Sequence, residues 1–222
     1  MMEYFAKLVP LELKNESGLV FYSGRAAFEG TPPIYLIGAS PGGDRGLEIE
    51  ELVHDETQKA LQNPNRFWSS YLDATWSARG PGQEPMQKRL AHMFESLGID
   101  LRHIPSSNLI FSRSRSIAEI GADFDRLASL CWPFHQAVID QLKPRIVLCM
   151  GDDAGSYVRK KLNARQLLDH YVEDNNRGWR STAYAGEKAP VVVTVTHPSR
   201  AAWTNPKSDP TALVSRILKR SA

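Results

Sequence analysis

The chain has 222 residues, of which 42% are hydrophobic and 23% charged, enough for one well-cored domain and too few for two ordinary ones. Its formal net charge of +2 at pH 7 neither favours nor excludes a polyanionic partner. The two cysteines lie in no paired motif, which excludes a disulfide framework and a four-thiolate iron–sulfur cluster. The six histidines show no metal-binding spacing, so we expect neither a metal nor a cofactor.

The amino terminus carries Glu3 where a secretory signal needs a long apolar run, and no stretch of 18 apolar residues occurs. We expect a cytoplasmic protein without a membrane partner, and a monomer. Basic residues cluster at several points, among them Arg113 with Arg115 and, later, Arg200. A solvated surface is the usual explanation of such clusters.

The N-terminal half predicts one core strand and two helices. Residues 18–29 have the pattern of a small hairpin with Ser23-Gly24 as its turn, and the apolar residues 34–37 form the first core strand. A charge-alternating stretch predicts a helix over 47–61, and apolar residues at the spacing of one helical face predict another over 86–97. Between them lie an aromatic segment, 67–76, and a Gly/Pro loop, 79–85.

The C-terminal half predicts strands and helices in alternation. In chain order these are a strand at 107–111, a helix at 123–142 that Pro133 should kink or divide, a strand at 146–150, a helix from Asp152-Asp153 to about 162, an irregular stretch at 173–189, a strand at 191–195 and a last helix from Asp209-Pro210. Such alternation implies a parallel sheet covered on both faces. We expect one domain over 1–222, with its core at about 30–218, as a three-layer α/β/α fold with about four mainly parallel strands.

The turn after the first core strand is the first candidate site. Its residues 38–42 match the G-x-S-x-G pattern of serine hydrolases. In that pattern the residue after the serine donates its backbone N–H to the oxyanion hole, and Pro41 has no N–H. A nucleotide phosphate loop is also disfavoured, since neither a Walker motif nor G-x-G-x-x-G is present. The turn needs another explanation.

Four segments at strand ends, in this order, resemble the uracil-DNA glycosylase superfamily. They are the turn 38–42, the strand 106–111 with Asn108, the strand 147–151 ending in glycine, and Thr196-His197-Pro198-Ser199. The resemblance covers about residues 18–218. It implies an open α/β sheet whose carboxyl edge holds the site.

The resemblance implies that the turn after the first strand activates water and binds the flipped nucleotide. Ser40 would be the polar residue of that turn, and the substrate-binding residues would be Gly38, Ala39, Pro41 and Gly42. Relatives place Asp, Asn or Glu at positions where this chain has alanine and serine. Because a serine is a poor base at neutral pH, Asp44, close downstream, is a second candidate for the catalytic base.

Asn108 and His197 correspond to two further site residues. The Asn108 amide would donate to O4 and accept from N3–H of a base, which suits uracil and opposes cytosine. His197 would donate a hydrogen bond to O2 of the departing base, where negative charge develops. Residues 198–203 would enter the minor groove of DNA and fill the vacated stack, with Ser199, Arg200 and Trp203 as contacts. The aromatic residue that stacks on the base would come from Phe67, Trp68 or Tyr71.

The resemblance therefore implies a monofunctional DNA glycosylase that flips out uracil or another altered base and hydrolyses its N-glycosidic bond. No lysine lies in the first or last motif, so a Schiff-base lyase step is not expected. Two alternatives stay open. One is a non-catalytic or regulatory DNA-binding module on the same fold, favoured by the missing motif carboxylate. The other is a glycosylase for a bulky, phage-type base, whose pocket the segment 63–85 would widen.

Overall fold

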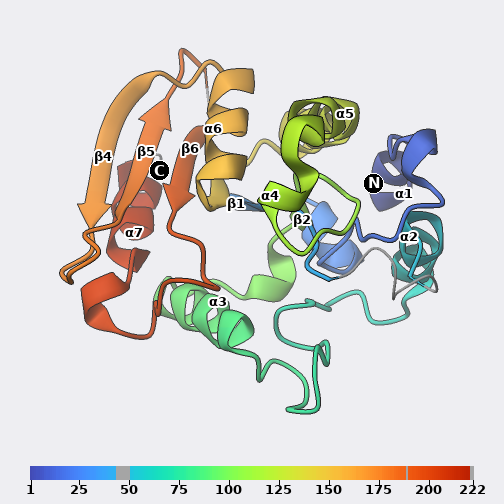
Figure 1. Ribbon diagram of the computed structural model, residues 1–222, viewed down its shortest axis with the longest axis horizontal. Coiled ribbons are helices and arrows are strands. Elements are labelled where there is room, and N and C mark those ends of the chain that lie inside the picture. Colours follow the sequence, from blue (N-terminus) through green and yellow to red (C-terminus); the bar gives the residue numbers. More distant parts are fainter. Residues whose placement is uncertain (44–50, 189, 221–222) are drawn as a thin grey trace.

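The computed structural model describes residues 1–43, 51–188 and 190–220 (Figure 1). Its centre is a six-stranded sheet in the order β2-β1-β3-β6-β5-β4. Four strands are parallel: β1 (Ile34–Gly38), β2 (Ser106–Asn108), β3 (Ile146–Met150) and β6 (Val191–Val195). Two antiparallel strands, β4 (Gln166–Val172) and β5 (Arg180–Ala185), extend the sheet beside β6.

Helices cover both faces of this sheet, which confirms the expected α/β architecture. The longer helices are α2 (Val53–Gln62), α3 (Pro85–Ser96), α5 (Phe124–Leu142), α6 (Asp152–Lys161) and α7 (Thr211–Arg220). Short helices are α1 (Met2–Ala6) and α4 (Ile117–Ile120), with 3-10 turns at Leu11–Leu13, Arg25–Phe28, Leu101–His103, Gly121–Asp123 and Pro206–Ser208.

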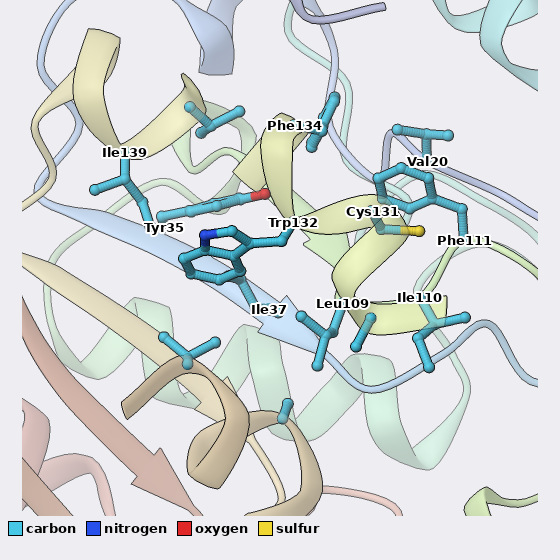
Figure 2. Close-up of a cluster of buried hydrophobic side chains, with 14 of the residues drawn as sticks. Val20, Tyr35, Ile37, Leu109, Ile110, Phe111, Cys131, Trp132, Phe134 and Ile139 are labelled. Atoms are coloured by element: carbon cyan, nitrogen blue, oxygen red, sulfur yellow. The ribbon is translucent and has the colours of Figure 1, made fainter. Parts of the chain in front are cut away.

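Alternate residues of the strands enter two separate apolar cores. Tyr35 and Ile37 of β1 pack with α1, α5 and α6 on one face, where aromatic side chains of α5 lie against the sheet (Figure 2). Ile34 and Leu36 pack with α3 and α7 on the other face. Because both faces are covered, every residue of β1 and β3 is buried, and these strands are continuous apolar runs in the sequence.

The sheet has two more strands than the four expected. The region 173–189, expected to be irregular, contains β5, and β4 precedes it. Both strands are rich in polar residues, and β4 is half exposed along its length. A strand at the edge of a sheet needs only one apolar face, so its sequence lacks the apolar run by which the central strands are found.

The expected hairpin over 18–29 is wrong. Residues 17–23 instead run beside β2 and its continuation, with hydrogen bonds from the N–H of Leu19 to Phe111 O (3.0 Å) and from the N–H of Tyr22 to Ser106 O (3.0 Å). The Gly24 N–H bonds outward to Trp68 O (2.7 Å), and a 3-10 turn then buries Phe28 in the core. The proposed turn residues therefore pair with a distant segment and not with each other.

Other expectations about the helices also differ from the structure. Pro133 does not divide α5, because the helix is held by burial of its neighbours Trp132, Phe134 and His135, whose packing outweighs the lost backbone hydrogen bond. The helix expected over 47–61 begins at Val53 among the described residues, and 44–50 lie outside them. The last helix begins at Thr211, whose N–H is capped by the Asp209 carboxylate (2.9 Å).

Two further searches covered the described residues. Within the described ranges, no helix combines the length and apolar character needed to cross a bilayer. In the same ranges, no three side chains of the metal-ligating types gather in one place.

Candidate active site

The carboxyl ends of β2, β1, β3 and β6 lie side by side along one edge of the sheet. Gly38 pairs with Asn108, and the N–H of Gly151 donates to Val195 O (2.9 Å). This edge therefore places Asn108, the turn 38–43, Gly151 and His197 in spatial order. Since neighbouring strands are about 4.8 Å apart, the backbones of β2 and β6 are about 14 Å apart there.

Of the two strands between Asn108 and His197, β1 ends in Gly38 and β3 is followed directly by Gly151. A Cβ on Gly38 would lie 2.1 Å from Asn108 Oδ1, so the asparagine side chain occupies the space above the end of β1. Gly151 has a φ of +93°, and its Cβ position lies 3.6 Å from Cβ and Cδ2 of His197. The glycines thus let an amide and an imidazole approach the centre of the edge from opposite sides.

Asn108 is buried and lies close to the Tyr22 hydroxyl. Burial raises the pKa of Tyr22 well above its usual range, against the opposing effects of Arg113 and of the nearby Asn108 side chain, so the hydroxyl stays neutral. Tyr22 stacks on Tyr71 with ring centroids 5.6 Å apart, and Tyr71 meets Trp76 edge to face at 5.6 Å. An aromatic series thus leads from Asn108 to Trp76, which is 39% exposed.

The buried side chain of Gln87 in α3 holds this aromatic series in place. Its amide nitrogen donates to Ser70 O (2.8 Å) and Ala74 O (2.9 Å), and its oxygen accepts the N–H of Glu84 (3.0 Å). Trp76 Nε1 donates to the hydroxyl of Ser70 (3.1 Å). The wall beside Asn108 is therefore anchored to a helix, although it lies outside regular secondary structure.

The turn after β1 is held by the segment after β2. Three carbonyls of the turn accept hydrogen bonds from that segment: Ala39 O from Ile110 N (3.0 Å), Pro41 O from Ser114 N (3.0 Å) and Gly42 O from Arg113 Nη1 (2.8 Å). Arg113 also forms an ion pair with Glu51. These bonds fix the turn relative to Asn108, on the strand that leads into the same segment.

The hydroxyl of Ser40 forms a hydrogen bond with that of a second serine, Ser114. The two oxygens lie 3.0 Å apart, and Ser114 is buried. Two hydroxyls can orient a water molecule, but neither is a base at neutral pH. Asp44, the other candidate, lies outside the described residues. Glu51 is a described carboxylate near this turn, and it is paired with Arg113.

The tautomer of His197 follows from its contacts. The backbone N–H of Ser199 donates to His197 Nδ1 (3.1 Å), and the Ser199 hydroxyl lies 2.7 Å from the same atom. Because a backbone N–H only donates, Nδ1 is an acceptor and the proton of the neutral ring is on Nε2. Burial, with a smaller effect of the Arg200 charge, lowers the pKa of His197 to about 4. At neutral pH the imidazole is an uncharged donor through Nε2.

The three residues after His197 that were expected to contact DNA differ in their burial. Ser199 and Arg200 are exposed, but Trp203 is fully buried and donates from Nε1 to Thr196 O (3.1 Å). The expectation that Trp203 contacts DNA is therefore wrong, because the indole is part of the core and supports the strand end before His197. Arg89 of α3 binds the carbonyl of Pro198.

The three aromatic candidates for base stacking lie in different places. Phe67 is 51% exposed and packs on His103 (centroids 5.2 Å apart), while the carbonyl of Trp68 accepts the Gly24 N–H. Of the three, only Tyr71 stacks on Tyr22 within the described residues.

Three residues near the site, Tyr22, Ser114 and Arg89, were not predicted from the sequence, and Arg113 was noted only as part of a basic cluster. Residues directly after a parallel strand share its edge, so 112–115 could have been found from the position of Asn108. Tyr22 gave no such signal, because its segment reaches β2 only through long-range hydrogen bonds.

A search among curated proteins finds no match to this chain. A family model described as the uracil DNA glycosylase superfamily matches residues 26–219, which include the whole sheet and all four motifs. The chain belongs to the uracil DNA glycosylase superfamily.

Proposed function

We propose that this protein is a monofunctional DNA glycosylase that hydrolyses the N-glycosidic bond of uracil or another altered base flipped out of DNA. Membership of the superfamily supports glycosylase chemistry on DNA. The observation that carries the proposal is the placement of Asn108 and His197 beside the two glycine strand ends, Gly38 and Gly151. In this proposal the flipped base lies between these two side chains at the edge of the sheet.

Asn108 is the proposed reader of the base. Its amide offers one donor and one acceptor side by side, which matches O4 and N3–H of uracil, while cytosine presents the reverse pattern. The contact with Tyr22 and the close approach to Gly38 restrict the amide to one place. A restricted amide discriminates because the wrong base leaves buried polar groups unpaired.

His197 is the proposed stabiliser of the leaving base. As the C1′–N1 bond breaks, its electron pair goes to the base, and negative charge develops on O2. The neutral imidazole donates from Nε2 to that oxygen without first losing a proton, and the Ser199 N–H at Nδ1 keeps this tautomer. The sugar gains cationic character, and water then adds at C1′ and loses a proton.

Ser40 is the proposed water-binding residue, together with Ser114. The pair supplies orientation, while the proton of the attacking water passes to solvent or to a carboxylate such as Asp44. Ser199 and Arg200, both exposed beside His197, are the proposed DNA contacts of this segment.

A non-catalytic DNA-binding protein is the second candidate. It is favoured by one observation: among the described residues, no carboxylate is hydrogen-bonded to Ser40 or to the backbone of the turn 38–43. The presence of Asn108 and of a His197 ring held in one tautomer favours catalysis, because DNA binding alone needs neither of these residues.

One experiment separates the two. The purified protein is incubated with single- and double-stranded oligonucleotides that contain uracil, hypoxanthine, xanthine or 5-hydroxymethyluracil, and abasic sites are then cleaved with alkali. Cleavage with at least one substrate, lost in His197→Ala, supports the glycosylase. DNA binding without base release from any substrate would support the binding module.

A further inference from the structure

The turn between β4 and β5 projects from the same edge of the sheet as His197. β4 and β6 run in the same direction, because each is antiparallel to β5 (Figure 1). Val172 at the end of β4 pairs with Arg180 at the start of β5, and the Ser181 hydroxyl accepts the N–H of Thr196 (3.2 Å). The turn, residues 173–179, is therefore a neighbour of the segment that follows β6.

Arg177 joins this turn to the segment after His197. Its Nη1 donates to Arg200 O (2.7 Å), and its Nη2 binds the carboxylate of Glu173 (2.7 Å). Its guanidinium carbon lies 4.2 Å from the ring centroid of Trp179. The backbone N–H of Asp174 also donates to Lys207 O (2.8 Å). The two segments are thus fixed relative to each other.

A groove of about 450 Å³ lies between the two segments. Asn176 and Arg177 line one side, and Asn205 and Lys207 line the other, with Asp174 also at its wall. Asn205 Oδ1 accepts the N–H of Lys207 (3.0 Å), which leaves the amide of Asn205 as a donor. Two of the five N–H groups of Arg177 are used in the bonds above, and three remain.

The charge of these segments favours an anion. Residues 173–180 and 200–208 contain four cations, Arg177, Arg180, Arg200 and Lys207, and two carboxylates. One of the carboxylates, Glu173, is buried against Arg177, and the charges of this ion pair cancel. Asp174 remains exposed. The remaining charges of the two segments, Arg180, Arg200 and Lys207 against Asp174, are therefore positive in sum.

We propose that this groove binds a phosphate of the DNA backbone outside the base pocket, with Lys207 and the remaining donors of Arg177 as its main contacts. A fork of guanidinium N–H groups with a nearby ammonium is suited to phosphate oxygens. The inference rests on the proposed function, since it takes DNA as the substrate. Such contacts fix the position of a protein on DNA without reading sequence. The groove would hold the duplex in register while His197 acts on the flipped nucleotide.

The test measures how binding to an undamaged duplex depends on salt. Lys207→Gln removes one cation of the groove, and the Lys207 side chain makes no hydrogen bond to the part of the chain that the structure describes. Lys219→Gln removes an equal charge from the last turn of α7, where the neighbouring Arg220 binds Leu168 O near the start of β4, at the opposite end of that strand from the turn 173–179. We expect Lys207→Gln to reduce the slope of log Kobs against log salt by about 0.9, the value for one lost phosphate contact, and Lys219→Gln to leave the slope unchanged.

The outcomes distinguish this inference from the proposed function. Equal slopes for Lys207→Gln and Lys219→Gln would overturn the proposal that the groove binds a DNA phosphate, even if the wild-type protein releases a base. A slope change confined to Lys207→Gln, with no base release from any substrate, would support the groove and reject the glycosylase. A wild-type protein that binds no DNA at low salt would overturn both. Arg177→Gln should reduce the slope by at least as much as Lys207→Gln, and a smaller effect also counts against the groove.

Discussion

The backbone N–H of Ser199 points at Nδ1 of His197 over 3.1 Å, and so decides which nitrogen of that ring carries the proton. A residue two positions later in the chain thereby prepares the opposite nitrogen, Nε2, to donate. The lowered pKa of the ring, about 4, also favours this neutral tautomer, because the imidazole carries no second proton at neutral pH.

Replacing His197 tests this arrangement. His197→Ala should lower the single-turnover rate of base release by roughly two to three powers of ten, the usual effect of losing one donor to a developing oxyanion, with little change in DNA affinity. Ser199→Ala keeps the backbone N–H and should cost much less. Equal losses in the two variants would show that the hydroxyl, and not the backbone, holds the ring.

Ser40 should contribute less than His197. Since its hydroxyl only orients water, Ser40→Ala should reduce the rate of base release less than His197→Ala does, and Ser40→Asp should raise it by supplying a carboxylate. If Asp44 is the base, Asp44→Asn becomes the more damaging change and Ser40→Asp gains nothing. Single-turnover rates of the three variants on one substrate decide between these outcomes.

Gly38→Ala should displace Asn108. The added methyl would lie 2.1 Å from Asn108 Oδ1, so the amide must move and base release should fall together with the melting temperature. For Gly42→Ala, in the same turn, no atom of the described residues other than its chain neighbours lies within 4 Å of the Cβ position, so this variant should keep the melting temperature of the wild type. Thermal unfolding of both variants provides the comparison. Similar stabilities would contradict the close approach at Gly38.

Stability should fall in mild acid because of His135. This buried ring lies 2.7 Å from the Tyr35 hydroxyl through Nδ1 and 3.2 Å from Leu109 O through Nε2, and burial lowers its pKa from 6.5 to about 4. Below pH 6.5 His135 binds a proton in the unfolded chain, whereas in the folded protein it stays neutral until the pH falls to about 4. The free energy of unfolding should therefore decrease across this interval, by about 3 kcal/mol for 2.5 pKa units.

Urea unfolding at several pH values measures this dependence, with His135→Gln as the comparison. The variant should be less stable at pH 7.5 and should lose less stability on acidification. An unfolding free energy of the wild type that is constant from pH 7 to 4.5 would contradict a neutral, buried His135.

The central strands and the order of the motifs could be predicted because each parallel strand is buried on both faces. That burial makes β1, β3 and β6 apolar runs, and the residues after them then share one edge. The antiparallel pair β4 and β5 could not be predicted in the same way, since half-exposed strands have mixed sequences.

Some site residues depend on contacts that no local pattern contains. Tyr22 reaches Asn108 because residues 17–23 pair with a segment more than 80 residues away, and the burial of Trp203 depends on packing between α3, α7 and the sheet. An isolated tryptophan after a motif is compatible with a surface or a core position. Only the fold decided between them.

The two outer edges of the sheet have a consequence for how the protein behaves at high concentration. An uncovered edge strand invites another chain to add to it, which is a route to aggregation. Beyond β2 the edge is occupied by residues 17–23, and β4 has an irregular register between Leu167 and Asp169. Arg216 and Arg220 of α7 bind Asp169 and the carbonyl of Leu168 on that strand. Both ends of the sheet are thus protected against strand addition, even though Leu167 and Val172 remain exposed.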